Sequence, residues 1–346
     1  MPEILVDLYS DTVTKPTPAM RDAMAQAEVG DEQKYEDPTT NRLQDMVAAL
    51  LGREAAVFLP SGTMCNEIAL AVHCEAGDEV VIDETAHAIT AEAGGPAVVA
   101  RAMPRTVHGD RGVYSAAQLE AAIRPPVRHA PVTSLAWVEQ TSNFGGGTCW
   151  KLDEVAAVCD LAHARGLRTH CDGARVMNAV VATGTPAAAF GAHFDSIWLD
   201  LSKGLGAPIG GVLAGSAQFI ERAWRWKQRL GGAMRQSGII AAAGVYALEH
   251  NVDRLAEDHA AARALAGGLA ALPGVAVDAV ETNIVFFDIV GSGMTAADLA
   301  DRALAEHGVR VGAVGPARLR AVTHLDVSAA DIDVALEALG SVLRAQ

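Results

Sequence analysis

The chain has 346 residues, of which 50% are hydrophobic and 20% are charged. Its formal net charge of −15 argues against nucleic acid and anionic membranes as partners, because both are bound through basic surfaces. The longest apolar stretches, such as Ile239 to Leu248, are shorter than the ~20 residues that span a bilayer. The chain shows no basic and apolar targeting segment at its start, so we expect a cytoplasmic globular protein.

The cysteine pattern indicates neither a disulfide framework nor a metal site. The chain has 5 cysteines, an odd number, and none of them shows the C-x-x-C spacing of zinc sites. We expect buried thiols and no bound metal.

The first part of the chain alternates helical spacing with short apolar runs. It predicts helices at 41–51, 64–74, 153–164 and 217–227, and strands at 55–59, 79–82, 134–138, 167–171, 196–199 and 210–213. This alternation is typical of an α/β fold with a mostly parallel sheet covered by helices on both faces.

The pattern changes after a long helical stretch at 237–269. Strands are predicted at 275–277, 283–288, 309–311 and 319–322, and helices at 295–306 and 329–343. Since single cores stop growing beyond roughly 250 to 300 residues, we expect a large domain at 1–250 and a small α+β domain at 251–346. The N-terminal segment is expected to join whichever domain closes the cleft between them.

Lys203 and Asp172 each follow an apolar run that we predict as a strand. A lysine flanked by glycine at a strand end can form a Schiff base with an aldehyde, and an aspartate can keep a pyridine nitrogen protonated. Each motif alone is common turn chemistry. Together, at the carboxyl ends of strands where ligands bind in such sheets, they indicate a pyridoxal phosphate site.

The segment Ser61-Gly62-Thr63 follows a predicted strand and opens a predicted helix. The backbone N–H groups of Gly62 and Thr63 would face an anion there, and the helix dipole favours a phosphate. The alternative is an ordinary helix N-cap. Ser202 and Arg235 are candidates for further phosphate contacts, although Arg235 can equally form a surface ion pair.

Three further side chains are candidates for the substrate. His87 can lie on the cofactor ring and move a proton, or it can be structural. Arg175 and Arg320 can hold an amino-acid carboxylate through planar, bidentate hydrogen bonds. On its sequence context alone, Arg320 would be a surface residue.

Several segments taken together resemble the low-specificity threonine aldolases, a family of fold type I pyridoxal phosphate enzymes, over nearly the whole chain. These segments are Asp7 to Thr14, Phe58 to Thr63, His87 with Glu92 to Gly95, His170 to Arg175, Leu201 to Gly206, Met234 to Gly238 and Val322 to Asp326.

The resemblance implies a role for most of the candidates. Lys203 is the Schiff-base lysine, Asp172 the partner of the pyridinium, and His87 the residue stacked on the ring. The substrate carboxylate is held by Ser10, Arg175 and Arg320, with Arg175 also beside the cofactor. The phosphate is held by Gly62, Thr63, Ser202 and Arg235. Because Arg235 is expected to come from a neighbouring subunit, the resemblance implies a homo-oligomer, a dimer or a tetramer, with shared active sites.

Three departures from the family pattern concern the substrate, and one of them is Tyr9, which stands where the opening motif usually has arginine. Ser142 stands where the family has a histidine near the substrate hydroxyl, so we expect His87, or water held by Ser142, to act as the base. The smaller serine is expected to leave room for a substituent bulkier than a methyl group. The segment Asp31 to Tyr35 stands where the family has Asp-Asp-Val-Tyr-Gly, so Lys34 is expected at or beside the tyrosine position near the cleft, next to Tyr35.

The activity that the resemblance implies is cleavage of the Cα–Cβ bond of an L-β-hydroxy-α-amino acid to glycine and an aldehyde. The substrate would be threonine, allo-threonine or a bulkier analogue. The alternatives are a β-eliminating lyase, a dehydratase or a racemase with the same cofactor. A non-catalytic carrier of the cofactor is a third possibility, which Lys203 and the two arginines disfavour.

Overall fold

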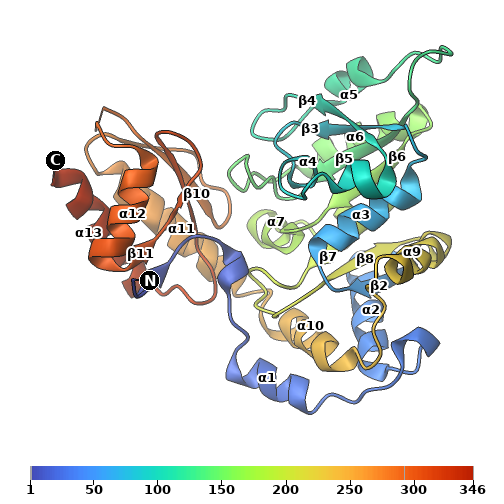
Figure 1. Cartoon of the computed structure of the whole chain (residues 1–346), viewed down its shortest axis with the longest axis horizontal. Helices are drawn as coiled ribbons and strands as arrows, with labels where there is room; N and C mark the ends of the chain where they lie inside the picture. The colour runs from blue at the N-terminus through green and yellow to red at the C-terminus, as the bar shows by residue number, and fades with distance from the viewer. Residues whose placement is uncertain (1, 292, 346) are drawn as a thin grey trace.

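The computed structural model describes residues 2–291 and 293–345 and shows two bodies of unequal size (Figure 1). The larger body carries a seven-stranded sheet. The smaller body carries both termini, so the chain leaves it near the start and returns to it at the end. Each body has its own cluster of buried hydrophobic side chains.

The large sheet has the strand order β2-β8-β7-β6-β5-β3-β4. Its strands are β2 (Ala55–Leu59), β3 (Glu79–Asp83), β4 (Met103–Val107), β5 (Thr133–Glu139), β6 (Arg168–Asp172), β7 (Ser196–Asp200) and β8 (Gly211–Gly215). Only β8 runs antiparallel to its neighbours, which confirms the predicted mostly parallel sheet. The sequence did not predict β4, because this edge strand contains Pro104 and is largely exposed.

Helices cover both faces of this sheet, because successive strand residues point to opposite faces. Val57 and Leu59 pack in one cluster with α3 (Gly62–His73) and α9 (Ala217–Arg229). Ala56 and Phe58 pack on the other face, in a cluster with residues of α2 (Pro38–Leu50) and α6 (Leu152–Ala164). The remaining helices of this body are α1 (Pro18–Ala25), α4 (His87–Thr90), α5 (Ala116–Ala122), α7 (Val176–Thr183), α8 (Ala187–Gly191) and α10 (Gly238–His250).

The smaller body has a four-stranded antiparallel sheet in the order β12-β13-β10-β9. Its elements are α11 (Leu255–Ala270), β9 (Val275–Val277), β10 (Ile284–Ile289), α12 (Ala296–His307), β11 (Val309–Arg310), β12 (Gly312–Ala313), β13 (Arg318–Val322) and α13 (Ala329–Arg344). The N-terminal strand β1 (Val6–Asp7) pairs with β11, and Val6 and Leu8 enter this core. The N-terminal segment therefore packs with the smaller body, and the boundary near residue 250 stays a prediction.

The helical stretch predicted at 237–269 is two helices, α10 and α11, separated by a short turn after His250. Asn251 is buried in this turn and its side-chain amide donates a hydrogen bond to the carbonyl of Leu205. An amide that bonds outside the helix stabilises a break, which periodicity alone does not reveal.

Two further features concern the chain as a whole. All five cysteines are free thiols and are buried, as predicted. Over residues 2–291 and 293–345, no helix has both the length and the apolar character needed to cross a membrane.

A buried ion pair ties α9 to the segment before α2. Lys227 Nζ lies 2.9 Å from Glu32 Oε2, and both side chains are at most 1% exposed. The same carboxylate accepts hydrogen bonds from Ser237 Oγ at 2.7 Å and from the backbone N–H of Met234. The carboxylate is therefore fully hydrogen-bonded, as a buried charge must be.

Replacing Lys227 by methionine should lower the free energy of unfolding by roughly 3–5 kcal/mol, because Glu32 would remain buried without its cation. The control is Arg42→Met, which breaks an exposed pair with Glu249 and should change stability little. Urea unfolding followed by tryptophan fluorescence measures both. Equal losses for the two variants would contradict the prediction.

Candidate active site

A cavity of about 270 Å³ lies where β5, β6 and β7 end. This is the edge of a parallel sheet at which ligands bind. Nine predicted site residues line it: Ser10, Gly62, Thr63, His87, Asp172, Arg175, Ser202, Lys203 and Arg320. The sequence assigned no role to several others: Thr12, Asn66, Glu92, Glu139, Thr141, Asn143, Trp198 and Asp200.

Lys203 lies just beyond the end of β7, with its side chain 19% exposed. Its Nζ is 2.5 Å from Asp200 Oδ2 and 5.7 Å from the centre of the Trp198 ring. Ser202 donates its backbone N–H and its hydroxyl to the other oxygen of Asp200, at 2.7 and 2.9 Å. Asp200 therefore fixes where the amine of Lys203 stands in the cavity.

Asp172 ends β6 and is almost completely buried. It accepts hydrogen bonds from Asn66 Nδ2 at 2.8 Å and from the backbone N–H of Ala174 at 3.0 Å. Burial, reinforced by the charge of Glu92, raises the pKa of Asp172, and Lys203 offsets part of this rise. Within the described ranges no cation forms an ion pair with Asp172, so this carboxylate suits a positively charged group placed in the cavity.

His87 begins α4 and places its ring, about 40% exposed, in the cavity wall. Its Nδ1 lies 2.8 Å from Glu92 Oε1, and its backbone N–H donates to Glu139 Oε2 at 2.6 Å. The hydrogen bond to Glu92 is the main reason that the pKa of His87 is raised.

Arg175 forms a buried, bidentate ion pair with Asp11, with both N–O distances at 2.7 Å. Burial alone would raise the pKa of Asp11, but Arg175 outweighs it and holds that pKa well below its usual range. The third guanidinium nitrogen of Arg175 donates to Asn143 Oδ1 at 3.1 Å. Much of Arg175 is thus committed to the protein itself.

Arg320 lies on β13 and faces this cavity, not open solvent. Its Nη1 donates to Asn143 Oδ1 at 3.2 Å, and its buried Nε has no hydrogen-bond partner among the described residues. Burial and the nearby charge of Arg175 lower the pKa of Arg320. The guanidinium groups of Arg175 and Arg320 thus both donate to the amide oxygen of Asn143, and Arg320 keeps an unused donor. Such a pair of guanidinium groups makes a site for a carboxylate.

The start of α3 closes the other end of the cavity. Ser61 caps the helix by accepting a hydrogen bond from the backbone N–H of Met64 at 3.2 Å. The backbone N–H groups of Gly62 and Thr63 belong to the first helical turn, where intrahelical acceptors are absent. A Cβ atom at Gly62 would come within 2.4 Å of the Trp198 ring, so only glycine lets the chain approach this closely. These residues fit a phosphate.

The residues present therefore fit pyridoxal phosphate. An amine, a buried carboxylate without a cation and a helix N-terminus line one cavity, and they match the aldehyde, the ring nitrogen and the phosphate of that molecule.

Ser142, which the sequence predicted near the substrate, is not among the residues that line the cavity. It is 2% exposed, and its hydroxyl accepts a hydrogen bond from the backbone N–H of Gly145 at 3.2 Å. A Cβ atom at Gly112 would lie 2.0 Å from this hydroxyl, so Gly112 occupies the space beside it. The neighbours Thr141 and Asn143 face the cavity instead.

Lys34, Tyr35 and Arg235 are also outside the cavity of their own chain. Lys34 and Tyr35 are exposed, and the Tyr35 ring packs edge-on against Trp224 at 5.8 Å. The Arg235 side chain is 63% exposed and pairs with Asp31 at 3.0 Å. Their predicted contacts with cofactor and substrate therefore require a second chain.

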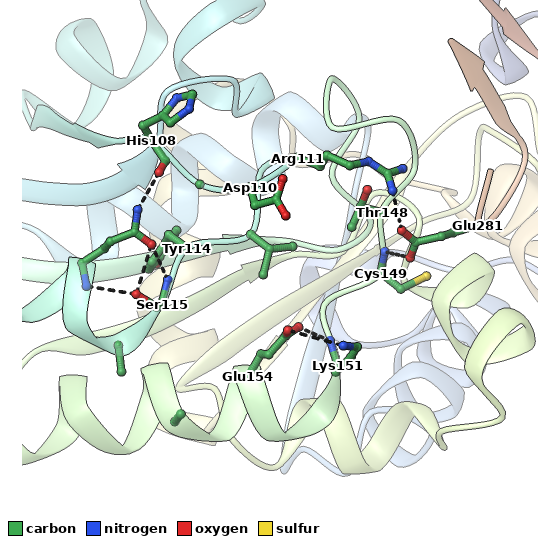
Figure 2. Close-up of a pocket in the computed structure, with 15 residues that line it drawn as sticks. His108, Asp110, Arg111, Tyr114, Ser115, Thr148, Cys149, Lys151, Glu154 and Glu281 are labelled. Atoms are coloured by element: carbon green, nitrogen blue, oxygen red, sulfur yellow. Dashed lines mark hydrogen bonds and ion pairs between the residues drawn. The ribbon is translucent and has the colours of Figure 1, made fainter. Parts of the chain in front are cut away.

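A larger cavity, of about 820 Å³, lies beside the 143–149 loop, and Figure 2 shows the residues that line it. Arg111 and Glu281 point toward each other and pair at 2.9 Å. Arg111 also donates to the carbonyls of Gly145 and Ala279, and Glu281 accepts from the backbone N–H of Cys149. These contacts tie the smaller body to the large one beside this cavity.

Comparisons with known proteins agree with this geometry. Residues 7–292 match the model of the beta-eliminating lyase family. The chain is 42% identical to the low specificity L-threonine aldolase of Escherichia coli K12 over 325 residues, 94% of this chain and 95% of that protein. It is 40% identical to low-specificity L-threonine aldolase 1 of Arabidopsis thaliana over 337 residues, 96% and 94% of the two chains.

Solved structures show the same fold. The threonine aldolase of Leishmania major has a TM-score of 0.84 at 19% identity, covering 98% of this chain and 99% of that one. The aspartate aminotransferase of Rhizobium meliloti has a TM-score of 0.70 at 15% identity, covering 99% and 92%. The predicted fold type I is thus confirmed. The family model and the near full-length relatives together show that this chain belongs to the beta-eliminating lyase family and, within it, to the low-specificity L-threonine aldolases.

Proposed function

We propose that the chain is a pyridoxal phosphate-dependent lyase that cleaves an L-β-hydroxy-α-amino acid to glycine and an aldehyde. One observation carries the proposal: Lys203 and Asp172 line the same small cavity as the paired guanidinium groups of Arg175 and Arg320. An amino acid can therefore place its amine near Lys203 while its carboxylate is held by the arginines. The names of the relatives support the same activity.

The residues divide the work of binding and orientation. Arg320, with the N–H groups of Arg175 that Asp11 and Asn143 leave unused, would bind the substrate carboxylate and so fix the orientation of the amino acid in the cavity. Asp172 keeps the ring nitrogen protonated through its buried negative charge. Gly62, Thr63 and Ser202 hold the phosphate. When bound, pyridoxal phosphate withdraws the electron pair of the bond that breaks at Cα.

Proton transfer is assigned to His87, because Ser142 is turned away from the cavity. His87 accepts the proton of the substrate β-hydroxyl as the Cα–Cβ bond breaks and the new C=O bond forms. The released aldehyde carries the former Cβ. A proton then adds at Cα, which completes glycine.

The alternatives differ in their products. β-Elimination or dehydration would give a keto acid and ammonia, and racemisation would give the other enantiomer without cleavage. A non-catalytic carrier would give no product, and the unused donor on Arg320 argues against it, because a carrier needs no substrate carboxylate site.

For the assembly and location, we propose a cytoplasmic homodimer or homotetramer with shared active sites. Tyr35 is 56% exposed, Ile239 is 49% exposed, and the Arg235 side chain, which pairs with Asp31, is 63% exposed. Exposed aromatic and aliphatic side chains and an unburied arginine suit a subunit contact. The five free cysteines suit a reducing compartment.

With the holoenzyme, L-threonine, L-allo-threonine and L-phenylserine should yield glycine and the matching aldehyde in equal amounts, because one carbon–carbon bond breaks per turnover. Amino-acid analysis and an alcohol dehydrogenase-coupled aldehyde assay measure the two products. A keto acid with ammonia in place of glycine would contradict the proposal.

Replacing Lys203 by alanine should remove both the visible absorbance of the bound cofactor and at least ~99% of the turnover, because the amine is the attachment point. Lys15→Ala is the control, since its side chain does not line the cavity. A cofactor adduct that borohydride still reduces on the Lys203→Ala chain would show that another lysine was the right choice.

If sites are shared, mixing Lys203→Ala chains with Arg235→Ala chains should restore activity, because each mixed dimer contains one intact site. Equal mixing should give about a quarter of wild-type activity from two nearly inactive variants, by random pairing around a two-fold axis. In the control mixture Arg302→Ala replaces Arg235→Ala, because Arg302 is a partly exposed arginine that pairs with Glu306. Failure of the mixture to gain activity would place Arg235 in its own chain's site or in none.

A further inference from the structure

A chain of hydrogen bonds along the cavity wall connects His87 to Asp172 through Glu92 and Asn66. Asn66 Nδ2 donates to Glu92 Oε1 at 2.7 Å and to Asp172 Oδ2 at 2.8 Å. Trp198 Nε1 donates to Asn66 Oδ1 at 2.7 Å, and this bond fixes the orientation of the amide, because an indole N–H cannot accept. The two carboxylates are therefore held apart by one neutral donor, and Glu92 turns its Oε1 to His87.

The side chain of Glu92 is fully buried, and its Oε1 faces two nitrogen atoms, Asn66 Nδ2 and His87 Nδ1. Glu67 lies beside it on α3, and neither of its carboxyl oxygens has a hydrogen-bond partner among the described residues. Burial, followed by the charge of Glu92, raises the pKa of Glu67 to about 8. Burial thus favours the neutral form of Glu67, and the hydrogen-bond partners of these two carboxyl groups lie at Glu92 Oε1.

The loop backbone around Glu92 packs closely against Glu67. A Cβ atom at Gly95 would lie 1.8 Å from Glu67 Oε1, so the chain passes directly over this carboxyl group. The packing leaves the carboxylate of Glu92 little freedom to turn away from His87.

A buried carboxylate at Nδ1 decides which nitrogen of the imidazole carries the proton. Glu92 accepts only, so Nδ1 of His87 must donate, and in the neutral ring Nε2 then has the free lone pair. Nε2 of His87 has no protein hydrogen-bond partner within the described ranges, and the ring lines the cavity.

We propose that Glu92, held in place by Asn66, is a positioning residue that keeps the proton of His87 on Nδ1 and presents Nε2 as the acceptor for the substrate hydroxyl proton. This rests on the proposed aldol cleavage. It gives the site an oriented base without a histidine at position 142.

Three carboxyl groups act on the charge of His87. Glu92 raises its pKa through the hydrogen bond, and Asp172, at the end of β6, and Glu139, at the end of β5, raise it through their charge. Removing the charge of Glu92 therefore lowers the pKa of His87. Because the base must be neutral, the acidic limb of the pH profile should then move to lower pH, while the weaker base slows the reaction.

The test compares Glu92→Gln, Glu92→Asp and Glu84→Gln in the holoenzyme. Glu92→Gln should lower kcat by at least about tenfold, which is a part of the roughly 10²–10⁴ that a positioned base contributes, with little change in KM. The acidic limb of kcat/KM should shift to lower pH, and Glu92→Asp should recover part of both effects. Glu84→Gln is matched, because it removes the carboxylate from an exposed pair with His108 at 2.6 Å, and it should behave as wild type.

A second measurement does not depend on turnover. ¹⁵N NMR of histidine-labelled wild-type holoenzyme should show His87 with Nδ1 protonated and Nε2 unprotonated, the signal being assigned by its loss in His87→Asn. A proton on Nε2, or a Glu92→Gln profile that coincides with wild type, would overturn the proposal. If no β-hydroxy amino acid yields glycine, the proposed function is contradicted, but the role of Glu92 is not. The tautomer of His87 that NMR measures then tests whether Glu92 positions the imidazole.

Discussion

The buried ion pair between Arg175 and Asp11 is the interaction on which the active site depends. Asp11 belongs to the N-terminal segment, Arg175 follows β6, and Asn283 of the smaller body donates to the same carboxylate at 3.1 Å. Three separate parts of the chain thus meet at one charge. A buried charge is tolerated only when its partners are complete, and breaking such a pair typically costs ~3–5 kcal/mol. The smaller body is therefore held in the one position that lets Arg320 face the cavity.

The loop that carries Asn143 is fixed from its other side by contacts with the smaller body. Arg111 and Glu281 bind its backbone at Gly145 and Cys149, and Thr282 donates to the carbonyl of Gly147 at 2.9 Å. The loop cannot follow Arg175 or Arg320 if either moves, so Asn143 stays between them. Two cations then converge on a neutral oxygen, and a substrate carboxylate is the group that relieves their repulsion.

The sequence predicted those parts of the site that follow from topology. Lys203 and Asp172 end two strands of one parallel sheet, so knowing the strands was enough to bring them together. Asn66 was missed because helical spacing does not show which face of α3 lies toward the cavity. One signal was present: Asn66 and Glu67 are consecutive polar residues within an otherwise apolar helix, and buried polar residues there need a partner.

Loops and subunit contacts were beyond the reach of the sequence pattern. Thr141, Ser142 and Asn143 are consecutive, yet a turn sends only the middle side chain away from the cavity. The family resemblance predicted that Arg235 contacts a phosphate. A sequence pattern does not show whether that phosphate is bound by the same chain or by a neighbouring subunit.

The position of Ser142 also changes what a serine at this place implies for the substrate. Its hydroxyl is packed against Gly112, so a smaller residue at 142 leaves no empty space beside the substrate. A histidine there would collide with Gly112 or move the loop, and with it Asn143 and the two arginines. The serine is therefore part of the loop that positions the carboxylate site, and the departure from the family pattern acts on binding through Asn143. We therefore assign proton transfer to His87. Its buried partner Glu92 belongs to a different segment and does not depend on that loop.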